Sequence, residues 1–302
     1  MDTLILHQYA GSPFSEKIRC LLGFLNLPSA QVEIPVIMPR PLLMPLTGGY
    51  RRTPVLQIGR EIFCDTALIS KVLASRSGNT QLYPKHLQAA VEHLAFWADT
   101  FLFKVVVSVA FQPKALADNP LFSDEAAASA FMADRAAFSE GSAGLQIPLE
   151  VALGHFDIWM TTFNRQLEQS RYLFGDHPTI ADFSVYHCLW FIAERPALAA
   201  DLEAFPHALR WLAAMKQWGH GQTQTMSGNE ALEVAAKAPG LPPLSEGQVS
   251  KVVAIDYGLQ PVTGSAVVVP HVPEAFSLKR QDAAVGDVLV HFPKLGFRLD
   301  PV

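Results

Sequence analysis

The sequence predicts an α/β domain, then an all-helical domain, then a small β-rich segment at the C-terminus. Strand and helix patterns alternate over residues 1–80, whereas over 85–238 apolar residues recur with a period near 3.6 and strand signals are almost absent. From residue 240 onward, short β-rich runs are separated by Gly, Pro and Asp. Because 302 residues exceed the size at which a single hydrophobic core keeps growing, we expect these segments, 1–80, 85–238 and 240–302, to be separate units.

The first unit reads as βαβ followed by ββα. An apolar run at 4–6 predicts a strand, which a tight loop joins to a helix whose apolar residues continue to Leu25. A β-rich run at 31–37 follows, and Gly59-Arg60 joins two further strands at 54–58 and 61–63, since Gly suits the first position of a type II′ turn. Asp65 then caps a helix.

The second unit contains one clear helix start, and the third is short. Thr179 places a hydroxyl at an N-cap position and Asp182 a carboxylate three residues later, which is a capping-box arrangement with Asp in place of Glu. The β-rich runs of the third unit lie at 252–255, 266–269 and 287–292. A segment of this length folds poorly alone, and we therefore expect it to dock on the helical domain.

Composition excludes several functional classes. A net charge of −5, without any block of Lys and Arg, argues against a protein that binds the nucleic-acid backbone or an anionic membrane. The N-terminus lacks a signal-peptide pattern, and the apolar run 101–111 contains Lys104 and is too short to span a bilayer. We therefore expect a cytoplasmic protein.

Cysteine and histidine usage points the same way. Cys20, Cys64 and Cys188 are few, odd in number and far apart, which fits buried thiols in a reducing compartment better than a disulfide framework. The ten histidines form no motif with metal-ligand spacing, so no metal site is expected.

The loop from Ser12 to Ser15 carries the first chemical signal. It joins the first strand to the first helix, so it directs backbone N–H groups and the positive end of the helix at any ligand above it. Both ends of the spacing typical of a Cys-x-x-Cys motif are Ser, which disfavours a dithiol oxidoreductase and implies that a reactive sulfur is supplied by a bound thiol. Two interpretations remain: the Ser12 hydroxyl donates a hydrogen bond to that thiolate, or the two serines only cap the helix.

Two further signals lie before and after the predicted hairpin. A cis Thr53-Pro54 bond would expose backbone groups for pairing with a peptide-like ligand, whereas a trans bond would make Pro54 the ordinary first residue of an edge strand. Asp65-Thr66 offers N–H groups and a hydroxyl to a carboxylate, although the pair is equally consistent with a simple N-cap.

Together these motifs resemble the glutathione transferase family over residues 3–220. The matching segments are Ser-Pro-Phe-Ser-Glu-Lys-Ile-Arg at 12–19, Arg-Thr-Pro-Val-Leu at 52–56, Asp-Thr-Ala-Leu-Ile at 65–69 and Thr-Ile-Ala-Asp at 179–182. The resemblance implies a thioredoxin-like N-terminal domain that binds glutathione and an all-helical C-terminal domain. The segment 240–302 lies outside the common family core, and the sequence assigns it no role.

The resemblance also implies residue roles. Ser12 aligns with the catalytic residue of the serine-type and cysteine-type classes, counted back from Arg19. Tyr9 is a reserve candidate, because it lies one residue closer to Arg19 than the tyrosine classes require.

The remaining implied roles concern the glutathione molecule. Arg52 stands where the family has a cation that contacts the glycine carboxylate, and the Thr53-Pro54 bond is expected to be cis. Val55 is expected to pair its backbone with the cysteinyl part, while Asp65 and Thr66 hold the γ-glutamyl end.

The function implied is transfer of glutathione, as co-substrate, to a small hydrophobic electrophile, as in detoxification, by a homodimeric enzyme. The alternative is a non-catalytic protein that keeps the glutathione-binding fold for binding or regulation. Aromatic residues near the expected electrophile site are read as core and not as site residues; they are Phe96, Trp97, Phe101 and Phe103.

Overall fold

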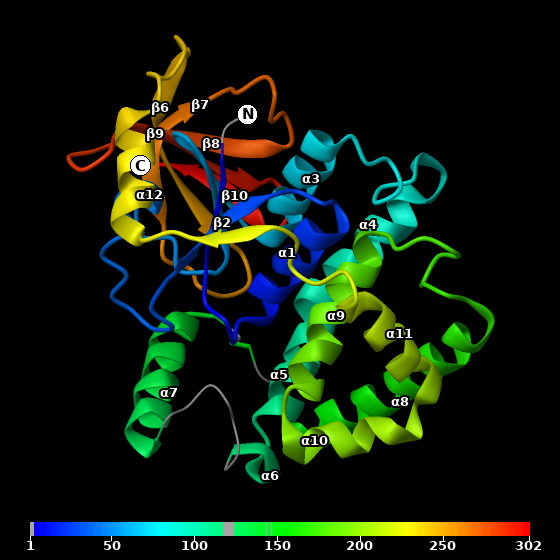
Figure 1. Ribbon diagram of the computed structural model, residues 1–302. Helices are drawn as coiled ribbons and strands as arrows, with labels where there is room; N and C mark the ends of the chain where they lie inside the picture. The colour runs from blue at the N-terminus through cyan, green and yellow to red at the C-terminus, as the bar shows by residue number, and fades with distance from the viewer. Residues whose placement is uncertain (1–2, 117–123, 143, 146) are drawn as a thin grey trace.

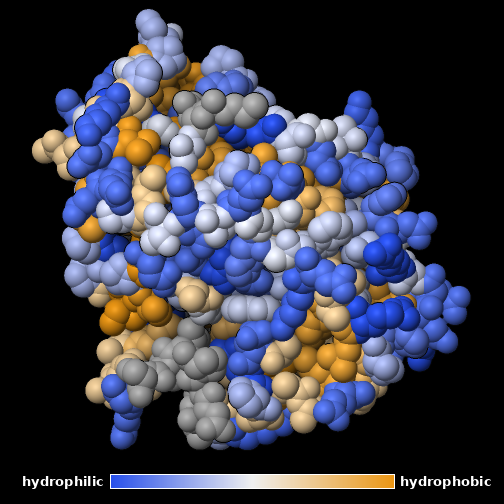
Figure 2. Space-filling model, viewed as in Figure 1, coloured by the Kyte–Doolittle hydropathy of each residue, from blue (hydrophilic) through white to orange (hydrophobic). Residues whose placement is uncertain are grey.

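The computed structural model describes residues 3–116, 124–142, 144–145 and 147–302. Figure 1 shows a sheet-containing upper part and a helical lower part, with α7 standing apart from the other helices of the lower part. Polar side chains cover most of the face seen in Figure 2, and hydrophobic ones show between them. The predicted α/β, helical and β-rich segments are all present.

The N-terminal domain has the predicted βαβ and ββα order. Strand β1 pairs with β2 in parallel and with β3 in antiparallel orientation, and β3 and β4 form the predicted hairpin. Gly59 has a φ of 59° at the turn, a conformation that costs a residue without a Cβ little. The elements are β1 (Leu4–Gln8), α1 (Pro13–Phe24), β2 (Ser29–Glu33), α2 (Met44–Thr47), β3 (Val55–Ile58), β4 (Glu61–Cys64) and α3 (Thr66–Ser77).

The helical domain is organised around α9 (Ile180–Ala193), in which twelve of the fourteen residues are buried. Its start is the predicted one: the Asp182 carboxylate accepts hydrogen bonds from the Thr179 backbone N–H at 2.9 Å and from the Thr179 hydroxyl at 3.1 Å. The other helices are η1 (Lys85–Leu87), α4 (Gln88–Trp97), η2 (Ala98–Leu102), α5 (Phe103–Ala110), α6 (Pro113–Leu116), α7 (Glu125–Ser139), α8 (Leu149–Gln169), α10 (Pro196–Ala199), η3 (Ala200–Ala204) and α11 (Pro206–Lys216).

One continuous helical stretch, Lys85–Ala110, is long and apolar enough to cross a membrane by length and composition. More than half of its apolar window is buried inside the molecule, where Val91, Leu102 and Val106 belong to the main hydrophobic core. The core of a globular domain therefore accounts for its apolar character. Within it, η2 is a π-helical segment, a distortion often found at functional sites.

The C-terminal segment extends the N-terminal sheet. Its strands are added beyond β4, beginning with β9, and complete a ten-stranded sheet. The strand order is β10-β6-β7-β8-β9-β4-β3-β1-β2-β5. Strand β9 pairs with β4 in parallel, with Ile62 opposite Val290. The new strands are β6 (Glu246–Ala254), β7 (Val262–Val267), β8 (Ala275–Asp282), β9 (Gly286–Pro293) and β10 (Phe297–Pro301).

This docking differs from the expectation that the segment packs on the helical domain. The reason is that β4 would otherwise be an edge strand with unpaired backbone groups, which a further strand satisfies. Contacts with the helical domain exist but are smaller: the Phe138 ring of α7 lies 5.6 Å from the Tyr257 ring, and the Gly258 N–H donates to the Phe138 carbonyl at 3.1 Å.

The chain between the helical domain and the extension also belongs to the sheet. Strand β5 (Thr223–Thr225) pairs with β2 in parallel, and α12 (Gly228–Lys237) buries Ala231 and Ala235 against one face of the sheet. Figure 1 shows α12 in front of this face, on the side away from α1 and α3. The bundle therefore ends with α11, before the expected limit of residue 238, because both edges of the N-terminal sheet and its open face require covering.

Polar contacts fix α12 to the sheet. The buried His7 Nε2 lies 2.8 Å from Gln57 Oε1, and Gln57 Nε2 donates to the Ala231 carbonyl of α12 at 2.9 Å. Arg60, at the β3–β4 turn, donates to the Ala236 carbonyl of α12 at 2.8 Å. Because Gln57 Nε2 donates to the Ala231 carbonyl, the Gln57 Oε1 atom faces His7 as an acceptor. His7 therefore donates from Nε2 and is held neutral.

We expect this histidine to make the fold sensitive to acid. Burial lowers the pKa of His7 from 6.5 to about 4, although the Gln57 hydrogen bond opposes the change. Between these pH values the unfolded chain binds more protons than the folded one, so stability is present above pH 6.5 and is lost as the pH falls toward 4. The loss attributable to His7 is about 3 kcal/mol, measurable by urea unfolding at a series of pH values.

The His7→Gln variant should show a flatter dependence of unfolding free energy on pH over this range. The exposed His86→Gln is the matched control and should leave the dependence unchanged. Equal slopes for wild type and His7→Gln would contradict the assignment.

Candidate functional site

The loop before α1 presents Ser12 at the helix N-terminus. The Ser12 hydroxyl accepts a hydrogen bond from the Ser15 N–H at 3.2 Å, so the capping interpretation is seen directly. The side chain is 2% exposed. Among the described residues the hydroxyl donates no hydrogen bond, which leaves its proton for a ligand. The Ser15 hydroxyl is buried and has no partner within the described ranges, so Ser12 and not Ser15 is the cap.

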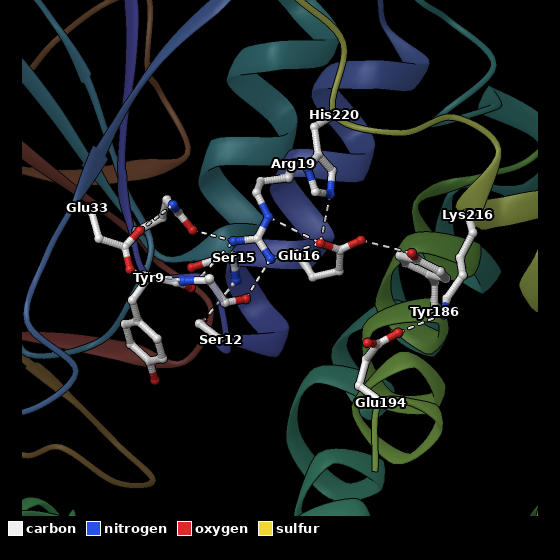
Figure 3. A network of polar contacts seen from close by, with 12 residues as sticks. Tyr9, Ser12, Ser15, Glu16, Arg19, Glu33, Tyr186, Glu194, Lys216 and His220 are labelled. Atoms are coloured by element: carbon white, nitrogen blue, oxygen red, sulfur yellow. Dashed lines mark hydrogen bonds and ion pairs between the residues drawn. The ribbon is translucent and has the colours of Figure 1, made fainter. Parts of the chain in front are cut away.

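A buried arginine holds this loop in place. Arg19 donates to the Ala10 carbonyl at 2.9 Å and to the Tyr9 carbonyl at 3.4 Å, and it also contacts the Gln8 side chain. Figure 3 shows the guanidinium of Arg19 beside the loop, with the Tyr9 ring pointing away from it. These hydrogen bonds hold in place the loop backbone that carries Ser12.

Glu16 balances the charge of Arg19 and links it to the helical domain. Its carboxylate accepts from Arg19 at 2.9 Å, from the Tyr186 hydroxyl at 2.9 Å and lies 3.0 Å from His220 Nε2 (Figure 3). Burial alone would raise the pKa of Glu16, but His220 and Arg19 outweigh it and hold the pKa below its usual value. The charged groups of this network have hydrogen-bond partners, and their role is structural.

The predicted cis-proline and the start of α3 lie together. The Thr53-Pro54 bond is cis, as predicted, and the Thr53 hydroxyl accepts from Arg40 at 2.9 Å. Asp65 caps α3 by accepting from the Ala67 N–H at 2.9 Å. It does so with a φ of 73°, a left-handed backbone that costs a non-glycine residue about 1–3 kcal/mol and is typical of functional sites.

A cavity of about 570 Å³ opens between α3, α4 and loops of the C-terminal extension. Five of the predicted glutathione-binding residues line it: Arg52, Thr53, Pro54, Asp65 and Thr66.

The other predicted residues lie outside this lining. Val55 is fully buried in β3, opposite His7 of β1 and Cys64 of β4, so the structure does not bring it to the cavity. Ser12 does not line the cavity either, but the neighbouring Phe14 does.

A buried charge cluster lies at the cavity wall beside Thr66. Lys17 of α1 is fully buried; its Nζ lies 2.6 Å from Asp99 Oδ2 and 3.3 Å from the Thr66 hydroxyl. His187 Nε2 lies 3.0 Å from the other Asp99 oxygen. Burial alone would raise the pKa of Asp99, but Lys17 and His187 outweigh it and hold the pKa below its ordinary value.

This cluster suits an amino-acid ligand group. Lys17, the Thr66 hydroxyl and the N-terminus of α3 are donors for a carboxylate, and Asp99 lines the cavity as an acceptor for an ammonium group. Thr66 and Asp99 both contact the Lys17 ammonium, so the donors and the acceptor lie close together.

Arg52 is engaged by the extension. Its Nη1 lies 3.6 Å from Asp65, while Nη2 contacts the Asp256 carboxylate and donates to the Tyr257 carbonyl at 2.6 Å. The guanidinium carbon also lies 4.0 Å from the centre of the Tyr257 ring. The side chain expected to bind a ligand carboxylate thus already has two carboxylate partners.

A second, mostly apolar cavity of about 410 Å³ lies on the other side of the α1 loop. Tyr9 and Pro13 line it, together with residues of α5 and α7 such as Val107 and Met132. The ring of Phe14, which lines the first cavity, lies 4.6 Å from that of Phe103, which lines the second. This aromatic contact is therefore a wall common to both cavities, and Phe14 lies two residues beyond Ser12.

The aromatic residues read as core from the sequence divide into two groups. Phe103 is 7% exposed and belongs to the main core, and Trp97 is half-buried against it. Phe96 lines the first cavity, and Phe101 is 39% exposed, with its ring 5.3 Å from that of His155. Phe103 is thus both a packing and a lining residue, whereas Phe96 is a lining residue and Phe101 is exposed, so neither of these two belongs to the core, contrary to the expectation.

Two other kinds of chemistry find no support. Over the described ranges, no group of three or more His, Cys, Asp or Glu side chains is placed to hold a metal ion. Ser277, His291 and Glu61 follow one another like a hydrolase triad, with 2.8 Å from Ser277 Oγ to His291 Nδ1 and 3.5 Å from His291 Nε2 to Glu61. Ser277 is 4% exposed and lines neither cavity, so a substrate cannot reach it.

Several site residues were missed from the sequence. Asp99 gave a usable signal, since it is an isolated carboxylate in an apolar helix. Lys17 lies inside the quoted motif at 12–19 but was given no role. No sequence pattern indicated a site role for Asp256 and Tyr257, because only the strand pairing of the extension brings them to Arg52.

Comparisons with known proteins agree with this geometry. The family model described as glutathione S-transferase, N-terminal domain, matches residues 6–81, and the C-terminal domain model matches residues 151–214. No curated protein matches the chain. The crystal structure of a GST-like protein from Pseudomonas syringae is 35% identical, covers 100% of both chains and superposes with a TM-score of 0.81.

Other solved structures share the fold over part of this chain. A glutathione S-transferase from Rhodospirillum rubrum is 19% identical, covers 71% of this chain and 88% of its own, and has a TM-score of 0.52. One from Methylobacillus flagellatus with glutathione bound is 18% identical, with coverages of 71% and 95% and a TM-score of 0.51.

A thioredoxin-like domain with a cis-proline loop, joined to a helical bundle, defines a protein of the glutathione transferase type. The chain belongs to the glutathione S-transferase family, and the predicted resemblance is confirmed. The Pseudomonas syringae protein matches it over its full length, extension included.

We expect Lys17 to be essential to the stability of the site. Replacing it by Met leaves the buried Asp99 carboxylate with His187 alone, which should lower the unfolding free energy by about 3–5 kcal/mol in urea unfolding. The matched control is Lys71→Met, whose side chain is 34% exposed and pairs with Glu92 at 3.0 Å. It should cost less than about 1 kcal/mol, and similar losses for both variants would contradict the assignment.

Proposed function

We propose that the protein binds glutathione in the first cavity and transfers it to a small hydrophobic electrophile held in the second. The carrying observation is that two cavities of different chemistry share the Phe14–Phe103 contact as a common wall, two residues from Ser12. One is lined by Thr53, Pro54, Asp65 and charged groups, and the other is mostly apolar.

In this arrangement Thr66, Lys17 and Asp99 bind the γ-glutamyl end of glutathione. The tripeptide then runs along the Thr53-Pro54 loop, where backbone groups of a cis-proline turn can pair with it. Since Thr53 and Pro54, and not Val55, line the cavity, Thr53 takes the pairing role first assigned to Val55. The thiol is placed at the N-terminus of α1.

The chemistry is nucleophilic substitution or addition by the sulfur. The thiol gives its proton to solvent, and an electron pair of the sulfur forms a bond to the electrophilic carbon. In substitution a leaving group departs with the pair of the broken bond; in addition the displaced π pair takes up a proton from solvent. Ser12, by donating a hydrogen bond to the thiolate, and the positive end of α1 both favour the charged form of the sulfur. Holding the two reactants side by side contributes the rest of the acceleration.

The alternative is a non-catalytic protein that binds glutathione. The observation in its favour is that Ser12 is 2% exposed and already serves as the helix cap. Turnover of a generic electrophile such as chlorodinitrobenzene separates the two functions. Assembly as a homodimer stays a prediction, for which sedimentation is the direct measurement.

Glutathione should stabilise the fold. A ligand that binds only the native state adds about 2.7 kcal/mol at a hundredfold excess over its dissociation constant, so the melting temperature should rise with glutathione concentration. Cysteinylglycine, which lacks the γ-glutamyl end, is the matched ligand control and should have little effect. The Thr66→Val variant, which removes the hydroxyl placed at the γ-glutamyl end, should need more glutathione for the same shift, and an unchanged wild-type melting curve at millimolar glutathione would contradict binding.

Replacing Ser12 by Ala should raise the pKa of the bound thiol. Losing a hydrogen bond to a charged group costs about 1.5–3 kcal/mol, equivalent to roughly one to two pKa units, and turnover near neutral pH should fall accordingly. The measurement is thiolate absorbance against pH with glutathione bound. Loss of the cap should separately lower stability by about 1 kcal/mol.

Two variants accompany this measurement. Ser15→Ala removes a hydroxyl that is buried without a partner and should leave both the thiol pKa and the turnover unchanged. Tyr9→Phe tests the reserve residue, whose ring lines the second cavity. If Ser12→Ala leaves the pKa and the turnover as in wild type, Ser12 is a helix cap only.

A further inference from the structure

The end of the first cavity at Arg52 is built by two parts of the chain that are distant in sequence. Arg52 and Asp65 come from the N-terminal domain, and Asp256, Tyr257 and Phe297 come from the extension. The guanidinium carbon lies 4.0 Å from the Tyr257 ring centre and 5.3 Å from that of Phe297. All five residues line the cavity, so a ligand that fills it meets this group.

The charge of this end is negative. One guanidinium lies against two carboxylates, at 3.6 Å from Asp65 and in direct contact with Asp256, and these three side chains are 13%, 22% and 24% exposed. The other cation on the extension side, Lys294, is exposed and donates to the Pro273 carbonyl at 2.9 Å. A free carboxylate brought to Arg52 therefore meets a surplus of negative charge at low exposure to water.

The same end nevertheless holds two hydrogen-bond donors without an acceptor. In the described part of the chain, Arg52 Nε and the Tyr50 hydroxyl are buried without a partner. Tyr50 is 7% exposed and lines the cavity. It lies near enough to Asp65 and Arg52 that, after burial, their charges are the main influences on the raised pKa of its hydroxyl. Unsatisfied buried donors are costly, and a ligand acceptor would satisfy them.

We propose that this end of the cavity accepts a neutral hydrogen-bond acceptor, the carbonyl of an amide or ester, in preference to a free carboxylate, and that Asp256 sets this preference. A neutral carbonyl satisfies the two donors without approaching the carboxylates as a like charge. Resting on the proposed function, this makes the preferred thiol a γ-glutamylcysteinyl peptide whose glycine end is capped. Asp256 then acts as a specificity-determining residue contributed by the extension.

The test compares two ligands by isothermal titration calorimetry on the full chain. Glutathione and its glycine monoethyl ester differ at that end in charge and in the ethyl group of the ester, and the Asp256 variants separate the two contributions. The wild-type protein should bind the ester about tenfold more tightly than the free acid, because like-charge contacts in an interface are strongly unfavourable. Asp256→Asn should reduce the difference to less than threefold, chiefly by binding the free acid more tightly.

Two control variants make the result specific. Asp256→Glu keeps the charge and should keep the wild-type preference, and Asp300→Asn removes a carboxylate of the extension that lies outside the cavity and should change neither affinity. A wild-type preference for the free acid, or an equal loss of both ligands in Asp256→Asn, overturns the proposal while leaving glutathione binding intact. If neither ligand binds the wild-type protein, the proposed function fails and the inference fails with it.

Discussion

The open edge of strand β4 is the constraint on which the rest of the structure depends. A strand whose backbone N–H and C=O groups face solvent invites pairing with another chain, and here β9 supplies the partner, with Phe63 opposite His291. Once β9 is in place, the turn after it lines the same cavity as the start of α3, and the loop after β6 reaches Arg52. The third wall of the first cavity is therefore a consequence of how the sheet is completed.

Asp65 shows how fold and site share the same atoms. One residue caps α3, pairs with Arg52 and lines the cavity, and it does so from a strained left-handed backbone. Lys17 is similar, since it neutralises a buried carboxylate and also faces Thr66. In such a site, a variant that weakens ligand binding also lowers the stability of the fold, so stability and affinity have to be measured together.

What could be predicted from the sequence was the part determined by neighbouring residues. The cap at Asp65, the turn at Gly59 and the Thr179–Asp182 pair depend on a few adjacent side chains, and all three are present. The docking of the extension could not be predicted, because it depends on which edge is left open after the first domain has folded. The contact between Lys17 and Asp99 joins residues 82 positions apart, and that Thr53 and not Val55 lines the cavity depends on where β3 begins.

The position of β5 and β9 in the chain has a consequence for how the protein is made. Both outer sides of the N-terminal sheet are closed by strands that follow residue 222, β5 against β2 and β9 against β4. During synthesis from the N-terminus, the sheet therefore leaves the ribosome with both edges bare and remains so while the whole helical domain is translated. Closing pairs so distant along the chain is also slow, since a long loop has to be ordered first. The nascent protein is thus exposed to edge-to-edge association for most of its translation, and its assembly is completed only from the last strands.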